Sequence, residues 1–253
     1  MRYKERHTEI VNLLQQEKRV LVSELSKSFA VSEVTIRKDL QELEQMGLCR
    51  RFHSGAASID QTAFDVPVRQ KETENRQQKQ QIAKAAVEML GSCNSIILDA
   101  GSTAHFIARF LPRNKKLRVV TNSLLVGAEL GEFSNIDLLL TGGNVRHESQ
   151  ALIGPIALAS LSKVNVDIAF IGAMGVSARN GFTSATILEA QGKEAMLLAA
   201  RKKVVVADHS KLNKAAFAPF ARIDEVDMLI TDYGAPAQAV SELKAAGLNC
   251  ILA

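Results

Sequence analysis

The sequence predicts an α/β protein with two domains, a small helical one followed by a larger one built on a mostly parallel sheet. Two observations predict this. Helical patterns fill most of the first 57 residues, and from about residue 79 short apolar runs alternate with helical patterns. With 253 residues, 47% of them hydrophobic, the chain can bury two cores. We expect domains at 1–57 and 79–253, joined by a linker at 58–78.

The first domain is predicted to begin with two helices. Residues 2–16 and 22–29 carry apolar side chains at helical spacing, and Ser23 is expected to cap the second helix. Ala30 and Val31 then form a tight turn into a third helix. A short helix, a brief turn and an amphipathic helix together make a helix-turn-helix pattern.

The third helix is the stretch around which the first domain is organised. Ser32 is a good N-cap because its hydroxyl can accept from an orphan backbone N–H group. Ile36, Leu40 and Leu43 form one apolar stripe at helical spacing, and Gly47 stands where a helix commonly ends.

The opposite side and first turn of this helix are polar, as in helices that read the major groove with their N-terminal residues. The alternative is an amphipathic surface helix whose charges are merely solvated. On the first interpretation we expect DNA contacts from Ser32, Glu33, Val34, Thr35, Arg37 and Lys38.

A short hairpin is predicted after this helix. Side chains alternate over residues 48–53, and the pair Ser54–Gly55 breaks the run. Arg50, Arg51 and His53 would make this hairpin a basic wing suited to phosphates or a minor groove. The alternative is a solvated edge strand whose arginines discourage pairing.

These residues resemble a known family. The stretch SEVTIRKDLQELEQMGLCRRFHSGA is similar to the DNA-binding signature of the DeoR family of bacterial transcriptional regulators. Ser54 departs from the signature, because the family usually has glycine there. The matching positions are Ser32, Thr35, Ile36, Arg37, Lys38, Asp39, Leu40, Leu43, Gly47, Arg51, His53, Gly55 and Ala56.

The second domain shows alternating elements after a polar linker and a helical pattern over 68–90. Strands are predicted at 95–98, 117–121, 136–140, 166–171, 203–207, 226–230 and 248–252. Helices are predicted at 102–111, 124–130, 156–161, 187–200 and 237–246. This alternation is typical of a largely parallel sheet covered by helices.

Small polar residues follow five of the predicted strands. In open α/β sheets, ligands bind beyond the carboxyl ends of the strands, where backbone N–H groups can hold an anion. The runs are Asp99–Thr103, Asn122–Ser123, Gly142–Asn144, Gly172–Gly175 and Asp208–Lys211. Taken singly, glycine and serine also end strands and cap helices, and Ser102 by itself is readily interpreted as an N-cap.

This part of the chain also resembles the sensor domain of the DeoR family, which is similar in fold to ribose-5-phosphate isomerase. The runs that carry the resemblance are Asp99–Thr103, Thr121–Ser123, Thr141–Gly143, Asn180–Thr183 and Asp208–Lys211. The resemblance implies a phosphorylated sugar or sugar-like effector. The candidate effector residues are Asp99, Gly101, Ser102, Thr103, Thr121, Asn122, Ser123, Gly142, Gly143, Gly172, Gly181, Thr183, Lys193, Asp208 and Lys211. We expect Asp99 and Asp208 to accept from sugar hydroxyls, and Lys211 to offset phosphate charge.

The catalytic acids of the isomerase are not matched. Met174 and Gly175 follow Gly172–Ala173 where the isomerase has paired acids, and Lys193 stands near the position of its base. The pocket therefore indicates a sensor without proton-transfer chemistry. Two alternatives stay open. Glu189 or Glu194 could act as a base in a sugar-phosphate isomerase with an appended DNA-binding domain, or the pocket could be unused in a DNA-architectural protein.

Composition is consistent with a cytoplasmic regulator. The net charge of +4 is mildly basic and compatible with a nucleic-acid partner. The three widely spaced cysteines indicate neither a disulfide framework nor a metal site, and the N-terminus lacks a signal-peptide pattern. No apolar run is long enough to span a membrane. We expect operator DNA as partner, a homo-oligomer (dimer or tetramer), no cofactor, and packing or surface roles for His105.

Overall fold

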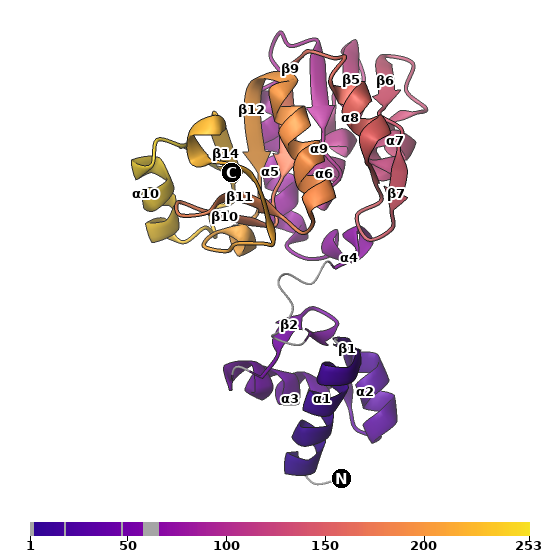
Figure 1. Cartoon of the computed structure of the whole chain (residues 1–253), viewed down its shortest axis with the longest axis vertical. Helices are drawn as coiled ribbons and strands as arrows, with labels where there is room; N and C mark the ends of the chain where they lie inside the picture. The colour runs from indigo at the N-terminus through magenta and orange to yellow at the C-terminus, as the bar shows by residue number, and fades with distance from the viewer. Residues whose placement is uncertain (1–2, 18, 47, 58–65) are drawn as a thin grey trace. The chain divides into compact units, whose positions relative to one another are not determined.

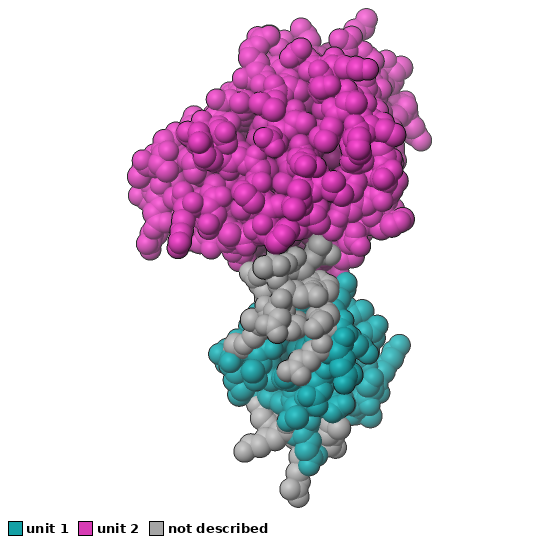
Figure 2. Space-filling view, in the orientation of Figure 1, with its two compact units in different colours: residues 1–64 teal, residues 65–253 magenta. Residues whose placement is uncertain are grey.

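The computed structural model describes residues 3–17, 19–46, 48–57 and 66–253 (Figure 1). The chain divides into two compact units, residues 1–64 and residues 65–253 (Figure 2). Gly47, expected to end the third helix, lies outside the described residues.

The first unit contains the three predicted helices, α1 (Tyr3–Glu17), α2 (Val22–Phe29) and α3 (Glu33–Gln45). They form because one apolar stripe of each helix packs into a shared core. Its buried members include Ile10, Leu14, Val20, Val22, Leu25, Ile36, Leu40 and Leu43. The cap predicted at Ser23 is wrong, because Ser23 lies inside α2 and the N-cap position is Leu21, which makes no side-chain cap bond.

A three-stranded sheet completes this unit. The predicted hairpin is β2 (Arg50–Phe52) and β3 (Gly55–Ala57), and β3 also pairs antiparallel with β1 (Arg19–Leu21). Sequence periodicity missed β1 because three residues are too few to show an alternation. Glycine is required at 55, since a Cβ there would lie 2.0 Å from the carbonyl oxygen of Val20.

The second unit is built on a seven-stranded sheet in which every pairing is parallel, as the alternating pattern predicted. Its strand order is β15-β14-β12-β9-β4-β5-β6. The strands are β4 (Ser95–Leu98), β5 (Leu117–Thr121), β6 (Ile136–Leu140), β9 (Val166–Gly172), β12 (Ala200–Val206), β14 (Met228–Thr231) and β15 (Asn249–Leu252).

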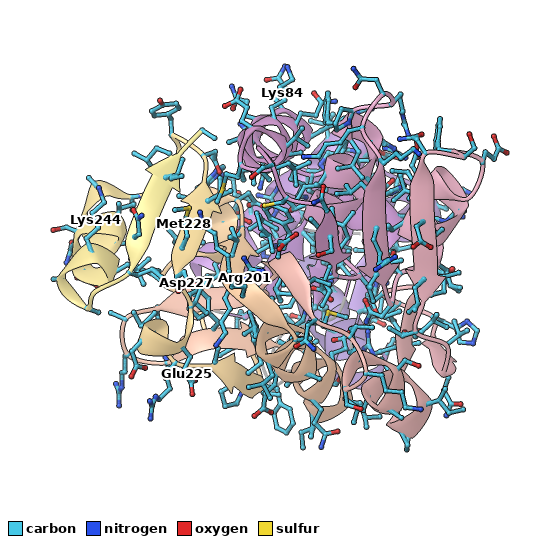
Figure 3. The ribbon with its side chains drawn as sticks, turned by 90° about the horizontal axis from the view of Figure 1, so that it is seen from above. Lys84, Arg201, Glu225, Asp227, Met228 and Lys244 are labelled. Atoms are coloured by element: carbon cyan, nitrogen blue, oxygen red, sulfur yellow. The ribbon has the colours of Figure 1, made fainter. Side chains whose placement is uncertain are left out.

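Helices cover both faces of this sheet, which Figure 3 shows from above. Neighbouring residues of β4 point to opposite cores, because Ile96 and Leu98 belong to one buried cluster and Ile97 to the other. The first cluster includes residues of α5 (Arg76–Glu88), α6 (Ser102–Phe110) and α7 (Leu124–Leu130). The second includes residues of α8 (Pro155–Leu161), α9 (Ile187–Leu198) and α10 (Ala237–Ala245).

Five short antiparallel strands were not predicted. They are β7 (Asn144–Arg146), β8 (Ala151–Ile153), β10 (Gly175–Ser177), β11 (Gly181–Ser184) and β13 (Ala218–Ala221). Strands β7 and β8 pair with each other, and β10, β11 and β13 form a separate sheet. Each has only three or four residues, and glycine begins two of them, so alternation is too weak to detect.

The helical pattern predicted over 68–90 is broken in the structure. Its two parts are α4 (Val68–Lys71) and α5, and they are separated at Asn75, whose φ of 48° is left-handed. Residues 66–78, expected to lie in the linker, belong to the second unit. The physical reason is burial, because Val68 is only 3% exposed and its N–H group donates to the carbonyl of Glu148.

Candidate functional site

The N-terminal half of α3 presents a polar face. The hydroxyl of Ser32 accepts from the backbone N–H group of Thr35 at 3.2 Å, which confirms the predicted cap. Val34 is 73% exposed, Lys38 is exposed, and Arg37 donates to Glu33 at 2.7 Å one turn earlier. These side chains share the outer surface of the helix.

The inner side of α3 is fixed by a buried carboxylate. Asp39 accepts from Nε of Arg6 at 2.5 Å and from Nη2 at 2.9 Å, and Nε2 of His7 lies 3.3 Å away. This contact ties α3 to α1. Sequence reasoning gave Asp39 no role, because its partners lie more than thirty residues away.

The wing, formed by β2 and β3, belongs to the first unit as α3 does. The N–H group of Arg51 donates to the Glu44 carboxylate at 2.8 Å, and the guanidinium of Arg19 lies over the Phe52 ring at 5.0 Å. His53 is exposed. The side chain of Arg50 lies outside the described residues. The wing is therefore anchored to the end of α3 and to β1.

A pocket in the second unit lies at the point where the strand order reverses. Strands β4 and β9 are neighbours, but β5 and β6 follow on one side and β12, β14 and β15 on the other. Asp99 follows β4, and its Oδ2 accepts from the N–H group of Gly172 at the end of β9, at 3.0 Å. Such a reversal opens a crevice at the carboxyl ends of the strands.

Many of the candidate effector residues meet in this pocket. Gly101, Ser102, Thr103, Gly172, Lys193, Asp208 and Lys211 all line it. Lys79, Ser149, Met174, Ser184 and Glu189 also line it, although they were not among the candidates. The cap of α6 is Gly101, so the interpretation of Ser102 as an N-cap is wrong.

Other candidates hold the framework instead of lining the pocket. Thr121 donates its hydroxyl to the Leu98 carbonyl at 2.6 Å, and Ser123 caps α7 by accepting from the Val126 N–H group. Asn122 donates to the Leu152 carbonyl. Thr183 donates to the Gly175 carbonyl at 3.1 Å.

The three remaining glycine candidates lie outside the pocket lining, Gly142 and Gly143 between β6 and β7 and Gly181 at the start of β11. Gly142, Gly143 and Gly181 have φ values of 70°, 116° and 64°. At Gly143 the tight turn also brings the backbone close, because a Cβ would lie 2.5 Å from the Ile153 carbonyl oxygen. These positions therefore shape the loops around the sheet.

A buried ion pair crosses the floor of the pocket. The ammonium group of Lys193 donates to Oδ2 of Asp99 and, at 3.0 Å, to the carbonyl oxygen of Gly172. The side chain expected near the position of the isomerase base is thus a lysine paired with a carboxylate. Its partner Asp99 faces Lys193 instead of the open pocket.

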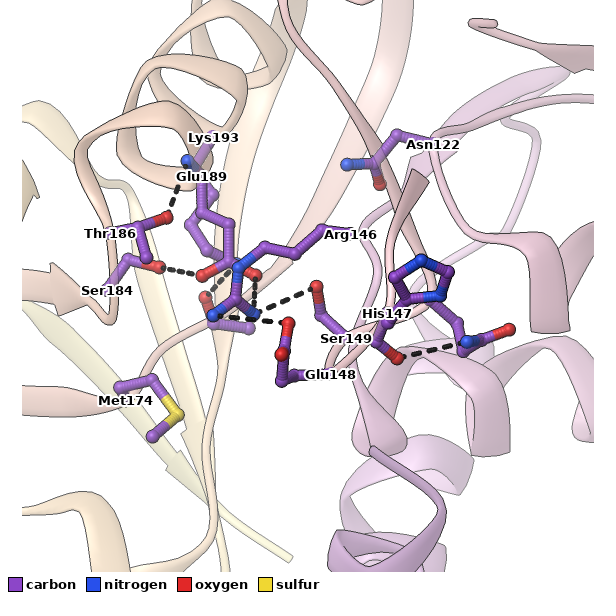
Figure 4. Close-up of polar contacts among 12 residues, drawn as sticks. Asn122, Arg146, His147, Glu148, Ser149, Met174, Ser184, Thr186, Glu189 and Lys193 are labelled. Carbon is purple, nitrogen blue, oxygen red and sulfur yellow. Dashed lines mark hydrogen bonds and ion pairs between the residues drawn. The ribbon is translucent and has the colours of Figure 1, made fainter. Parts of the chain in front are cut away.

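Figure 4 shows a second charged pair, between Arg146 and Glu189. Nη1 of Arg146 lies 3.3 Å from Oε1 of Glu189, and the hydroxyl of Ser184 lies 3.4 Å from the other carboxylate oxygen. Glu189 is thus held at the wall of the pocket. Glu194 is exposed and lines a separate groove together with Arg179 and other residues.

Asp208 and Lys79 line the pocket close to each other. Burial alone would raise the pKa of Asp208. The positive charges of Lys211 and Lys79, together with the hydrogen bonds from Ser210, outweigh burial and lower that pKa. Burial lowers the pKa of Lys79 to about 8, although Asp208, whose Oδ2 lies 3.9 Å away, opposes the shift. This part of the pocket holds a carboxylate among ammonium groups.

His105 has a packing role in α6. It is 5% exposed, its Nδ1 contacts the carboxylate of Glu72, and its Nε2 lies 3.3 Å from that of Glu129.

Among the described residues, no group of three or more His, Cys, Asp and Glu side chains could hold a metal ion. No described helix is long and apolar enough to cross a membrane.

Comparison with known proteins identifies the family. Residues 6–62 match the model of the DeoR-like helix-turn-helix domain, and residues 74–233 match that of the DeoR C terminal sensor domain. The chain belongs to the DeoR family. The chain is a DNA-binding transcriptional regulator, and the two matches confirm the resemblance on which we based the predicted function.

Relatives of this DeoR-family protein match over almost the whole chain. The HTH-type transcriptional regulator GlpR of Haloferax volcanii is 37% identical, covering 98% of this chain and 96% of that one. The glycerol-3-phosphate regulon repressor of Escherichia coli K12 is 29% identical, covering 96% of each chain. A ribose 5 phosphate isomerase A from Neisseria gonorrhoeae, covering 53% of this chain and 52% of that one, has a TM-score of 0.38 at 23% identity.

Proposed function

We propose that this DeoR-family chain represses a sugar-metabolism operon, and that a phosphorylated sugar or sugar-like effector bound in the second unit controls it. The DNA would be contacted by the outer face of α3 and by the wing. Because helix-turn-helix proteins bind paired half-sites, the active form would be a homo-oligomer, a dimer or a tetramer. Because operator DNA lies in the cytoplasm, a protein that binds it would be found there too.

The observation that carries the effector proposal is the distribution of charge in the pocket. The first turn of α6 lines it with Ser102 and Thr103, and Lys71, Lys79 and Lys211 also line it. Hydroxyls, ammonium groups and the N-terminus of a helix are suited to a phosphate. The carboxylate of Glu189 lines the pocket as well and can accept from sugar hydroxyls. An anionic group joined to a polyol fits both features.

The DNA proposal rests on the exposed half of α3. Thr35, Arg37 and Lys38 come from its first turns, and an arginine there can bond a guanine edge in the major groove. Arg51 and His53 extend the polar surface on the wing. The buried pair of Asp39 with Arg6 supports this interface by fixing α3 against α1.

The enzyme alternative is less well supported. Aldose isomerisation needs a base that can move a proton between adjacent carbons. Lys193 contacts Asp99 and Met174 cannot ionise. Of the two glutamates considered as bases, Glu194 lies outside the pocket and Glu189 is contacted by Arg146. Membership of the DeoR family also favours the regulator.

Two linked measurements test the proposal. First, fluorescence anisotropy with DNA upstream of the neighbouring operon measures operator affinity and its dependence on salt. Second, a thermal-shift screen with phosphosugars and their unphosphorylated parents identifies ligands, since a ligand of the folded state raises the melting temperature. We expect a phosphosugar to bind and to change operator affinity. Binding of the neutral sugars alone would contradict the proposal.

A further inference from the structure

One wall of the pocket comes from the segment through which the chain enters the second unit. Residues 66–79, which we call the connecting segment, follow the boundary between the units at residue 65. Val68, Lys71 and Lys79 line the pocket together with the first turn of α6. The two family models end at residue 62 and begin at residue 74, so neither covers Val68 or Lys71.

Residues of the pocket hold this segment in place. The amide of Asn75 donates to Oδ1 of Asp208 at 2.9 Å. The ammonium group of Lys79 donates to the carbonyl oxygens of Lys71 at 2.5 Å and of Glu74 at 2.6 Å. Both Asp208 and Lys79 also line the pocket. The position of α4 therefore depends on groups that a ligand would touch.

Lys71 reaches the pocket from α4 itself. Its Nζ lies 3.4 Å from the sulfur of Met174, which lines the pocket after the end of β9. A thioether is a weak acceptor, whereas an anionic oxygen forms a strong, charge-assisted bond with an ammonium group. A phosphate in the pocket would be a stronger acceptor for the Lys71 ammonium group than this sulfur is.

We propose that Lys71 binds the anionic group of the effector, and that the occupied pocket thereby fixes the connecting segment. This inference rests on the proposed function, that of a phosphosugar sensor. An effector can change DNA affinity only by binding two states of the protein with different affinity. We place the difference between these two states in the connecting segment, because this segment joins the pocket to the part of the chain that leads to residues 1–57.

The test uses the full chain with ribose 5-phosphate and glycerol 3-phosphate as probes in calorimetric titrations. In Lys71→Met, the loss of one charge-assisted bond should weaken binding about 10-fold or more. Lys71→Arg keeps the charge and should keep most of the affinity. The matched control is Lys84→Met, because Lys84 is exposed on the outer surface of α5 (Figure 3) and does not line the pocket.

Hydrogen exchange supplies a second readout that affinity alone does not give. The probe should slow exchange of the amides of residues 68–75 in the wild-type chain and in Lys84→Met, but not in Lys71→Met at equal occupancy. If Lys71→Met binds both probes with unchanged Kd, or shows the same slowing, this inference is overturned while the proposed function stands. If the wild-type chain binds neither probe nor any other phosphosugar, both are overturned.

Discussion

Arg6 of α1 and Asp39 of α3 form a bidentate ion pair in the core of the first unit, with side chains only 9% and 2% exposed. The pair connects the first helix of the unit to the helix that presents Arg37 and Lys38. The orientation of the face that we propose to contact DNA therefore depends on a contact made on the other side of the same helix.

Removing the carboxylate should destabilise the first unit. Asp39→Ala leaves Arg6 as a buried charge without its partner, and breaking such a pair costs about 3–5 kcal/mol. Urea unfolding followed by circular dichroism measures this loss, and operator affinity should fall with it. Glu42→Ala, on the same helix but not in this pair, is the control. A loss below about 1 kcal/mol in Asp39→Ala would show that the pair contributes little.

Arg37→Ala should weaken operator binding without affecting the fold. The side chain is 49% exposed and its pair with Glu33 spans one turn of the helix, so the stability cost is small. A loss of ~1–3 kcal/mol confined to one base pair would indicate base readout, and a uniform loss with a shallower salt slope would indicate phosphate contact. Lys27→Ala on α2 is the control. Unchanged affinity would remove Arg37 from the interface.

Stability should depend on pH through Lys79. The pKa of Lys79 is lowered to about 8 in the folded chain, from an ordinary value of 10.5. The unfolded chain therefore binds this proton more tightly than the folded chain does. At neutral pH the protonated Lys79 lowers the stability of the folded state. This loss disappears as the pH rises from 8 to 10.5, where the folded chain has released the proton.

The matched comparison is with Lys79→Met, which cannot titrate. Between pH 7 and pH 10, the free energy of unfolding of the wild-type chain should rise relative to the variant, by up to about 3 kcal/mol. Urea unfolding at each pH measures both. A constant difference across this range would show that the pKa of Lys79 is not lowered.

The pure protein should not isomerise pentose or hexose phosphates, even at saturating ligand. Glu189→Gln removes the carboxylate that could serve as a base, and it should change ligand affinity through the lost contact with Arg146. The measurement is ketose formation by a coupled assay alongside a thermal shift. Turnover that survives purification and disappears in Glu189→Gln would favour the enzyme alternative, and Glu194→Gln is the control outside the pocket.

Much of the architecture was predictable because periodicity is a local property. The predicted and observed bounds agree within three residues for all seven strands of the parallel sheet, since each strand is a short apolar run and the inner strands are buried. The five short antiparallel strands have no such signal. The helix predicted over 68–90 also failed, because Asn75 adopts a left-handed φ that apolar spacing does not reveal.

The pocket was predictable in part. Residues near the carboxyl ends of β4 and β9 meet because parallel strands end at the same edge, and Gly101 and Gly172 both line the pocket. Ser149 and Glu189 come from loops and a helix whose positions depend on the short sheets. The role of Asp39 depends on Arg6, which is distant in sequence. Such long-range contacts leave no pattern in a single sequence.

The charged groups of the pocket also have a consequence for the empty protein. Lys193 contacts Asp99, Arg146 contacts Glu189, and Lys79 stands near Asp208. Because the first two pairs neutralise each other without a ligand, these four groups leave no uncompensated charge in the pocket. We expect the empty regulator to persist in the cell instead of being unfolded and degraded. The cell would then sense the effector through the occupied fraction of a steady pool of protein, and not through the amount of protein.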